Sequence, residues 1–393
     1  MQDRIIYLDN NATTKVAHEV VQAMMPFFEE MYGNPSSMHT FGGDVAHYVQ
    51  YAREQVAQLL GTTSEEIVFT SCGSESDNTA ILGVATNSEN RKHIVTTAVE
   101  HPAVRNTVAY LGRKGYRVTE LGVGTDGMLD MDEVRSAITD ETALVTMMYA
   151  NNETGVIFPV EEVAEIAKEH GAIMHVDAVQ AVGKVPINLA KSNIDLLALS
   201  GHKLHAPKGI GALYIRKGTL VRPLIMGGHQ ERGQRAGTEA VPNIIGLGTA
   251  AELAWNQQNS GELDRIQQMR DDLENYILSN IPHCAVNGNR EHRLGNTSNI
   301  GFEYIEGEAI LLGLNQFGIC ASSGSACSSG SLEPSHVLRA MHVPFTSLHG
   351  SIRFSLSYNN TQEEIDFVKK HIVDIIKRLR EISPYSETSP MPN

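Results

Sequence analysis

The sequence predicts an α/β protein with a mainly parallel sheet, followed by a smaller α+β region. Between about residues 64 and 215, short apolar runs alternate with stretches of helical periodicity. Such alternation is typical of a parallel sheet covered by helices on both faces. The runs are apolar throughout, as expected of strands that are buried on both sides. Near Pro242 the alternation ends, which indicates a change of architecture.

Seven apolar runs are the expected strands of the large sheet, and four periodic stretches are the helices between them. The strands are Glu66–Thr70, His93–Thr97, Arg117–Leu121, Ala143–Tyr149, Ala172–Val176, Asp195–Leu199 and Gly211–Ile215. The helices are Glu75–Ala85, Pro102–Arg113, Met131–Ile138 and Val160–Glu169. Beyond Pro242 we expect one long helical stretch, Asn243–Ser279, then strands at Thr297–Phe302 and Ser351–Leu356, and helices at Gly307–Gln316, Pro334–Met341 and Thr361–Ile382.

The length of 393 residues predicts two domains, because it exceeds the usual size of one. We place a large domain at residues 16–257 and a small one at 258–382. An N-terminal segment, residues 1–15, is expected to pack with the small domain. Residues 383–393 are rich in Ser and Pro and are expected to form a disordered tail.

Composition limits the classes of function. A net charge of −15 argues against non-specific nucleic-acid binding and leaves no basic stripe for a membrane surface. No apolar run approaches the roughly 18 to 20 residues of a transmembrane helix. The N-terminus lacks the basic and apolar regions of a signal peptide. We therefore expect a cytoplasmic protein that binds neither nucleic acid nor membrane.

The four cysteines show no spacing typical of a zinc site, so no structural metal is expected. Cys72, Cys284 and Cys320 are expected to be packed, inert thiols. Cys327 differs, because the stretch Ser322–Ser331 around it is too small and polar to bury a side chain. A thiol on a Gly/Ser loop is accessible, as a nucleophile must be.

Two predicted strands deliver polar residues at their carboxyl ends, where open α/β sheets bind ligands. Asp177-Ala-Val-Gln180 follows one of them, and Ser200-Gly-His-Lys203 follows the next. A carboxylate and a lysine placed in this way suit pyridoxal phosphate (PLP): the lysine would hold its aldehyde as a Schiff base, and the carboxylate would keep its ring nitrogen protonated.

A purely structural role for these residues stays open, because any α/β protein places some Asp and Lys at strand ends. Three lysines compete with Lys203. Lys184 and Lys191 lie in polar or turn-like surroundings, and Lys208 follows on the loop beyond the site.

Further polar residues could complete such a site. Gly73 and Ser74 join a strand to a helix, so their amides can face a phosphate, although Gly-Ser is also plain capping. Thr238 lies in a second polar turn and is a possible phosphate donor. His101 precedes Pro102 and could stack on a ring and move protons, or it could be one of the structural histidines among 16.

With these residues in place, the chain resembles the cysteine desulfurases among the fold-type I PLP enzymes, most closely those of the nitrogen-fixation type. Matching motifs follow one another in family order along nearly the whole chain. They are Tyr7–Thr14, Gly33–Ser37, Thr97–Pro102, Asn151–Gly155, His175–Gln180, Ser200–Lys203, Arg235–Glu239, Ser322–Cys327, Ser331–His336 and Ser351–Leu356.

The resemblance implies the fold of a fold-type I PLP-dependent transferase, whose large domain holds a mainly parallel seven-stranded sheet beside a smaller α+β domain. It also implies residue roles. Lys203 would carry the cofactor, His101 would stack on its ring, and Asp177 would pair with the ring nitrogen. Gln180 and Asn152 would contact the ring hydroxyl. Gly73, Ser74, Ser200 and His202 would hold the phosphate, with Thr238 from the other subunit of a homodimer. Arg353 would bind the substrate carboxylate, aided by Asn34 and Asn152.

The activity implied is the conversion of L-cysteine to L-alanine, with a persulfide formed on Cys327. The sulfur would pass to a scaffold or acceptor protein of iron–sulfur cluster assembly, in nitrogenase maturation. No resident metal is implied, although Cys327 could transiently contact iron or a cluster. Cys72 departs from the family pattern and is interpreted as a packed thiol.

Alternatives on the same fold are a housekeeping desulfurase and a selenocysteine lyase. An aminotransferase is disfavoured, because it needs no loop thiol. A non-catalytic assembly scaffold is disfavoured by the presence of both Lys203 and Cys327.

Overall fold

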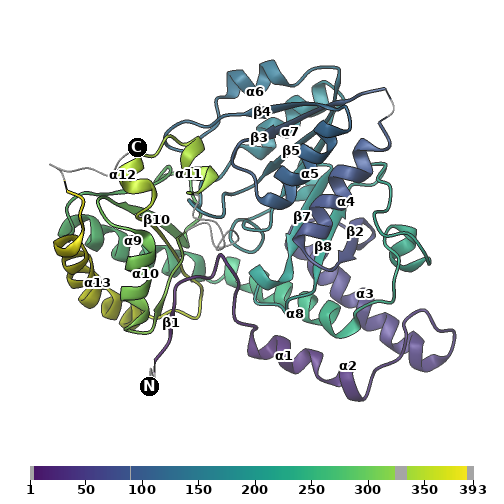
Figure 1. The fold of residues 1–393 in the computed structure, drawn as a ribbon. Helices are drawn as coiled ribbons and strands as arrows, with labels where there is room; N and C mark the ends of the chain where they lie inside the picture. The colour runs from purple at the N-terminus through teal and green to yellow at the C-terminus, as the bar shows by residue number, and fades with distance from the viewer. Residues whose placement is uncertain (1–3, 89, 324–333, 387–393) are drawn as a thin grey trace.

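The computed structural model describes residues 4–88, 90–323 and 334–386. It contains two regions, each built on its own sheet (Figure 1). A seven-stranded sheet with its helices is named the large domain, and a three-stranded sheet with its helices is named the small domain. Cys327 and most of the predicted tail lie outside the described residues. The predicted domain boundaries stay predictions.

The large sheet has the strand order β2-β8-β7-β6-β5-β3-β4. Only the pairs that involve β8 are antiparallel, so the predicted mainly parallel seven-stranded sheet is confirmed. The strands are β2 (Ile67–Thr70), β3 (His93–Thr97), β4 (Arg117–Leu121), β5 (Thr142–Met148), β6 (Ile173–Asp177), β7 (Leu196–Ser200) and β8 (Gly211–Ile215).

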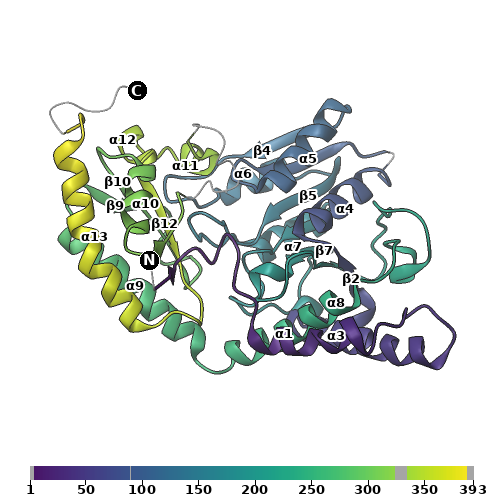
Figure 2. The same ribbon diagram turned by 60° about the horizontal axis from the view of Figure 1, so that its bottom comes forward.

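Successive side chains of the central strands enter different cores on the two faces of this sheet. Leu144 of β5 packs in the core under α4 (Gly73–Ala85) and α5 (Pro102–Arg113), whereas Val145 packs in the core on the other face. That second core lies under α7 (Val160–Glu169), α8 (Val241–Gln258) and α3 (Thr40–Leu60), and Figure 2 shows α8 running along α3. The apolar strands are therefore covered on both sides, as expected.

Helices that precede the sheet were not predicted, since no strand alternates with them. They are α1 (His18–Met24), α2 (Pro26–Glu29) and α3. The contact between α3 and α8 depends on a small residue: a Cβ added to Gly248 would lie 2.6 Å from the Cα of Ala52. Glycine at this position therefore allows the two helix backbones to approach closely. The large domain also contains α6 (Met131–Ala137).

The small domain has the antiparallel strand order β12-β10-β9. Helices α9, α10 and α13 close a core around Phe302 and Phe354, which are both fully buried. The elements are β9 (Cys284–Val286), β10 (Thr297–Phe302), β12 (Ser351–Ser355), α9 (Glu262–Asn280), α10 (Gly307–Asn315), α11 (His336–Ala340), α12 (Phe345–Leu348) and α13 (Gln362–Ile382).

Besides the N-terminal helices, the structure shows a helix break and short elements that were not predicted. The long helical stretch from Asn243 is two helices, α8 and α9, because Gly261 takes a positive φ of 79° and begins a new helix. The N-terminal segment forms β1 (Ile6–Tyr7), which pairs with β11 (Ile319–Cys320). Strands of two residues are too short for periodicity to reveal. Among the described residues, no helix has the length and apolar character needed to cross a bilayer.

Candidate active site

A cavity of about 560 Å³ lies at the carboxyl ends of β5, β6 and β7 and the N-termini of α4 and α5. The small domain contributes Arg353 of β12 to its wall. The cavity brings together ten of the thirteen predicted site residues. They are Gly73, Ser74, His101, Asn152, Asp177, Gln180, Ser200, His202, Lys203 and Arg353.

Asp177 is the last residue of β6 and is 6% exposed. Its Oδ1 accepts a hydrogen bond from the backbone N of Val179 at 3.0 Å. Burial raises the pKa of Asp177, against the opposing effects of His101, the Val179 amide and Lys203. A carboxylate buried in this way favours a positively charged partner within the cavity.

Lys203 ends a short 3₁₀ helix, Gly201–Lys203, directly after β7. Its Nζ donates to the backbone oxygens of Asn11 and Ala12 at 2.5 and 2.6 Å. The N-terminal segment therefore holds the predicted cofactor lysine. Sequence reasoning missed these contacts, although Asn11 and Ala12 lie within one of the family motifs.

His101 is the N-cap of α5, and its Nδ1 accepts a hydrogen bond from the backbone N of Ala103 at 3.2 Å. This bond assigns the proton of the neutral ring to Nε2. Burial lowers the pKa of His101 and Lys203 lowers it further, while Asp177 and Glu153 oppose this shift. His101 is therefore expected to be a neutral Nε2–H donor at the cavity wall near pH 7.

The start of α4 fits the predicted phosphate cradle. Gly73 and Ser74 are its first two residues, at the end of the helix that favours anions. A Cβ on Gly73 would lie 2.7 Å from Cγ2 of Val179 and 3.3 Å from Cβ of Ser200, so a side chain would fill this space. Burial, Lys203 and Lys208 lower the pKa of nearby His202 to about 4, which makes it a neutral partner near pH 7.

Arg353 lies on β12 between Ile352 and Phe354, which both point into the core of the small domain. Because strand side chains alternate, Arg353 faces the large domain instead. Its Nη2 lies 2.7 Å from Oδ1 of Asp9, and its Nη1 donates to the backbone oxygen of Asn152 at 2.9 Å. Among the described residues, nothing accepts a hydrogen bond from its buried Nε. A fixed guanidinium of this kind suits a substrate carboxylate.

Two predicted site residues lie away from the cavity of this chain, and a third is not among the described residues. Asn34 is exposed, and its Oδ1 accepts a hydrogen bond from the backbone N of Ser36. Thr238 is exposed beside Arg235, which pairs with Glu75 of α4. Cys327 lies outside the described residues. The three cysteines that are described form no disulfide, and Cys72, expected to be a packed thiol, is half-buried and lines the cavity.

A group of buried acids around the cavity was not predicted. Asp77 of α4 and Glu153 line it, and Glu100 lies beside His101 in the chain. Burial and the charge of Asp177 raise the pKa of Asp77 well above its ordinary value. Glu153 belongs to a family motif, but Asp77 lies in a helix, where a polar residue ordinarily indicates a solvent face.

Taken together, these side chains fit PLP. The amine of Lys203 suits its aldehyde, and the buried carboxylate of Asp177 suits its ring nitrogen. The N-terminus of α4 suits its phosphate, because Gly73 leaves space there that a side chain would occupy.

Comparison with known proteins agrees with this geometry. The chain matches the aminotransferase class-V family over residues 6–368. It is 60% identical to the cysteine desulfurase of Nostoc sp. strain PCC 7120 over 381 residues, which cover 97% of this chain and 95% of the relative. It is 56% identical to the cysteine desulfurase NifS of Azotobacter vinelandii over 381 residues, covering 97% and 94% of the two chains. The chain is a cysteine desulfurase of the class-V family.

Solved structures also resemble this desulfurase. A NifS-like protein superimposes with a TM-score of 0.90 at 39% identity, covering 96% of this chain and all of the other. A NifS-like protein from Rickettsia africae ESF-5 gives a TM-score of 0.85 at 32% identity, covering 95% of this chain and all of the other. The family and fold predicted from the motifs are confirmed.

Proposed function

We propose that this desulfurase uses PLP to convert L-cysteine to L-alanine and supplies the sulfur to an acceptor protein of iron–sulfur cluster assembly, in nitrogenase maturation. The observation that carries the proposal is the convergence of Lys203, Asp177, His101 and Arg353 on one cavity. The identity of 56% to NifS supports the nitrogen-fixation role over a housekeeping one.

The residues that would hold PLP are those that fit it. Lys203 would hold the aldehyde, Asp177 would pair with the ring nitrogen, and Gln180 and Asn152 would contact the ring hydroxyl. Gly73, Ser74, Ser200 and His202 would hold the phosphate. When bound, PLP supplies an electron sink for the negative charge that develops on the substrate Cα.

The protein's own groups then orient the substrate and move its protons. Arg353 binds the carboxylate as a two-pronged donor. The free amine of Lys203 would take the Cα proton, because its side chain lies in the cavity wall beside the substrate. His101 presents Nε2–H toward the cavity and can donate a hydrogen bond or a proton near the substrate sulfur.

Cys327 receives the sulfur. Its thiolate attacks the substrate sulfur, so that an S–S bond forms as the substrate C–S bond breaks. The electron pair of the broken bond stays with the carbon fragment, which is protonated to alanine. The persulfide on Cys327 then passes its outer sulfur to the acceptor protein.

We infer that the enzyme acts as a homodimer. Apolar side chains are exposed on two stretches of the chain near Asn34 and Thr238, the site residues that lie away from the cavity. They are Phe28, Tyr32, Met38, Phe41, Tyr48 and Tyr51 in one, and Leu220, Leu224, Ile225 and Met226 in the other. A large exposed apolar surface marks an interface. The first stretch includes Asn34 and the second precedes Thr238, so pairing these surfaces would bring both residues to a partner's site. The cytoplasmic location stays a prediction.

The test is to load the protein with PLP, add L-cysteine, and measure alanine together with the mass of each cysteine peptide. We expect alanine and one added sulfur on the Cys327 peptide. Cys327→Ser should keep bound PLP but form no alanine, whereas the matched variant Cys72→Ser should retain most activity. A persulfide on Cys72, which lines the cavity, would contradict the proposal.

A further inference from the structure

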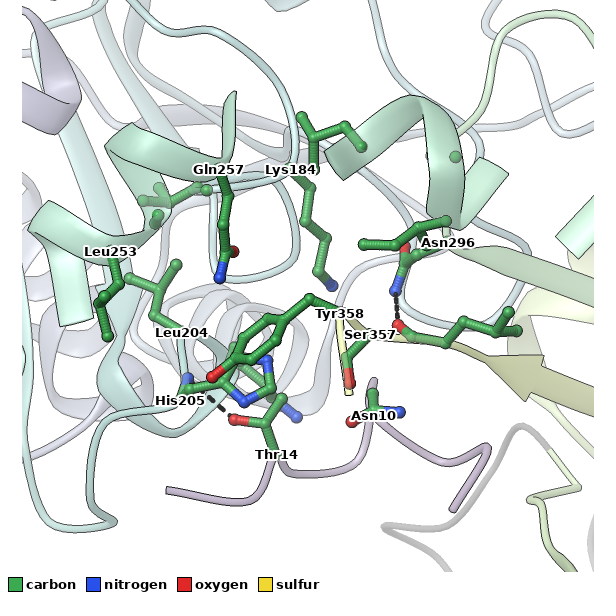
Figure 3. A pocket seen from close by; sticks show the side chains of 18 of the residues that line it. Asn10, Thr14, Lys184, Leu204, His205, Leu253, Gln257, Asn296, Ser357 and Tyr358 are labelled. Carbon is green, nitrogen blue, oxygen red and sulfur yellow. Dashed lines mark hydrogen bonds between the residues drawn. The ribbon is translucent and has the colours of Figure 1, made fainter. Parts of the chain in front are cut away.

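A second cavity is lined by residues of both domains, among them Lys203. Figure 3 shows this cavity from close by. Gln257 of α8 and Tyr358 of the small domain line it, and Lys184 extends into it. Lys203 lines both this cavity and the active-site cavity. Lys184 thus lies behind the wall of the active site, and the proposed mechanism gives it no role.

Lys184 contacts a residue of that wall directly. Its Nζ donates to Oε1 of Gln180 at 2.9 Å and to Oδ1 of Asn11 at 3.2 Å. Gln180 lines the active-site cavity and is only 5% exposed. Lys184 therefore contacts the active site indirectly, through its hydrogen bond to the side-chain amide of Gln180.

The contact determines which way the amide of Gln180 points. A lysine ammonium has three donors and no acceptor, so the amide atom that contacts it is the oxygen. The NH₂ group of Gln180 then lies on the side away from Lys184, where Nε2 donates to the backbone oxygen of Asn11 at 3.0 Å. Of its two N–H bonds, one serves Asn11 and the other can serve a group in the cavity.

Residues of the small domain hold the side chain of Asn11 in place. Both acceptors of Lys184, Oδ1 of Asn11 and Oε1 of Gln180, are therefore fixed. Asn296 donates to Oδ1 of Asn11 at 3.1 Å, and Nδ2 of Asn11 donates to Oγ1 of Thr297 at 2.8 Å. Neither oxygen that contacts Lys184 can turn away without breaking another hydrogen bond.

We propose that Lys184 is a positioning residue: it holds the amide of Gln180 with NH₂ toward the cavity, where it donates to the ring hydroxyl oxygen of PLP. The inference rests on the proposed function only in that PLP occupies this cavity. Without Lys184, only the bond from Nε2 of Gln180 to the backbone oxygen of Asn11 opposes rotation of the amide, and rotation would present the amide oxygen, which repels an anionic ring oxygen.

The electrostatic surroundings make this contact sensitive to pH. Burial, together with the charges of Lys203 and Arg353, lowers the pKa of Lys184 to about 7. His205 is another titratable neighbour, and Lys184 in turn lowers its pKa. A neutral amine carries a lone pair that can accept a hydrogen bond. Loss of the proton would therefore remove the preference for the amide oxygen.

The experiment measures PLP affinity and the pH titration of the visible absorbance of bound PLP. Lys184→Met should weaken PLP binding about three- to tenfold, the loss expected for one hydrogen bond. It should also raise the pH at which the visible band changes. Gln180→Ala should have the same effects, and the double variant should add nothing further, because both act through one contact. Lys184→Arg keeps a donor-only cation and should restore the parent titration.

Lys191→Met removes an exposed lysine from the same loop region and should leave both readouts unchanged. Circular dichroism would show that each variant is folded. Parent-like behaviour of Lys184→Met, or additive losses in the double variant, would overturn the inference alone. Absence of PLP binding by the parent protein would overturn the proposed function as well. PLP binding without alanine formation would contradict the function but leave the Lys184 test intact.

Discussion

Asp177 shares its surroundings with other acids that cannot all be charged. His175 lies two residues earlier on β6, so it faces the same side of the sheet, where α4 supplies Asp77. Nε2 of His175 and Oδ1 of Asp77 are 3.6 Å apart, and among the described residues neither atom has a hydrogen-bond partner. Burial also raises the pKa of Glu100 to about 8. A cationic ring nitrogen would allow Asp177 to ionise while Asp77 keeps its proton.

The raised pKa of Asp77 has a consequence for stability. The folded protein keeps this proton at a pH where the unfolded chain has released it, so stability falls as pH rises above the ordinary carboxyl range. Asp77→Asn imitates the protonated acid and should stabilise the PLP-free protein more at pH 8 than at pH 5. Thermal unfolding at both values measures this. An equal loss of stability at both would show that Asp77 is ionised.

The lowered pKa of Lys184 predicts a second pH dependence of folding stability, in the basic range. Its pKa is lowered from 10.5 to about 7, so the folded protein loses stability as pH falls from 10.5 toward 7 and the unfolded chain takes up the proton first. Lys184→Met lacks this loss. Its thermal midpoint without PLP should exceed that of the parent most near pH 7, and the difference should shrink toward pH 10. A difference that is the same at both values would contradict the lowered pKa.

Lys203 is expected to be indispensable, although Lys184 lies near it. Lys203→Ala should lose the visible absorbance and at least about 1,000-fold in alanine formation, because the positioned amine is both the attachment point and the base. The double variant Lys203→Ala/Lys184→Met serves as a control. Residual activity in the single variant that disappears in the double variant would show that Lys184 can act in its place.

At the scale of elements, strand ends were the most predictable part of the site. Parallel strands end at one edge, so Asp177 and Lys203 could be brought together from the order of apolar runs alone. Lys184 and Asn11 could not, because they lie on segments without periodicity and act through tertiary contacts. The break between α8 and α9 was missed because Gly261 interrupts an otherwise continuous helical pattern.

The start of α4 gives an element-scale prediction. Gly73→Ala places a methyl group 2.7 Å from Val179, so α4 or the residues after β6 must shift at the proposed phosphate site. We expect PLP binding to weaken at least about tenfold, a loss of about 1.4 kcal/mol. Equilibrium titration with PLP measures it. Gly122→Ala is the matched control, since a Cβ there meets nothing within 4 Å, and it should leave PLP affinity unchanged.

At the scale of the whole molecule, Arg353 joins the two domains. It extends from β12 to the backbone of Asn152 in the large domain and to Asp9 of the N-terminal segment. Arg353→Lys keeps the charge but loses the two-pronged geometry, so we expect KM for L-cysteine to rise about tenfold or more. Steady-state kinetics measures this. Arg117→Lys, at an exposed ion pair, is the control. An unchanged KM would assign the substrate carboxylate to another residue.

The proposed homodimer can be tested through its apolar surface. Met226 is 80% exposed, and Met226→Asp should shift the protein from dimer toward monomer in sedimentation while lowering PLP affinity, since Thr238 would no longer reach a partner. Ile382→Asp changes an equally apolar residue, 74% exposed, at the end of α13 and should leave the dimer intact. A monomeric parent with full activity would rule out the shared site.

The contacts of the N-terminal segment also constrain the order of synthesis. Asn10 and Asn11 bond to Ser355, about 345 residues later in the chain, and the same segment supplies the oxygens that hold Lys203. These contacts therefore cannot form until translation has passed Ser355. Contacts so distant in sequence form late in folding. A nascent chain that ends before Ser355 therefore lacks the contacts that hold the N-terminal segment, whose backbone oxygens bind Lys203.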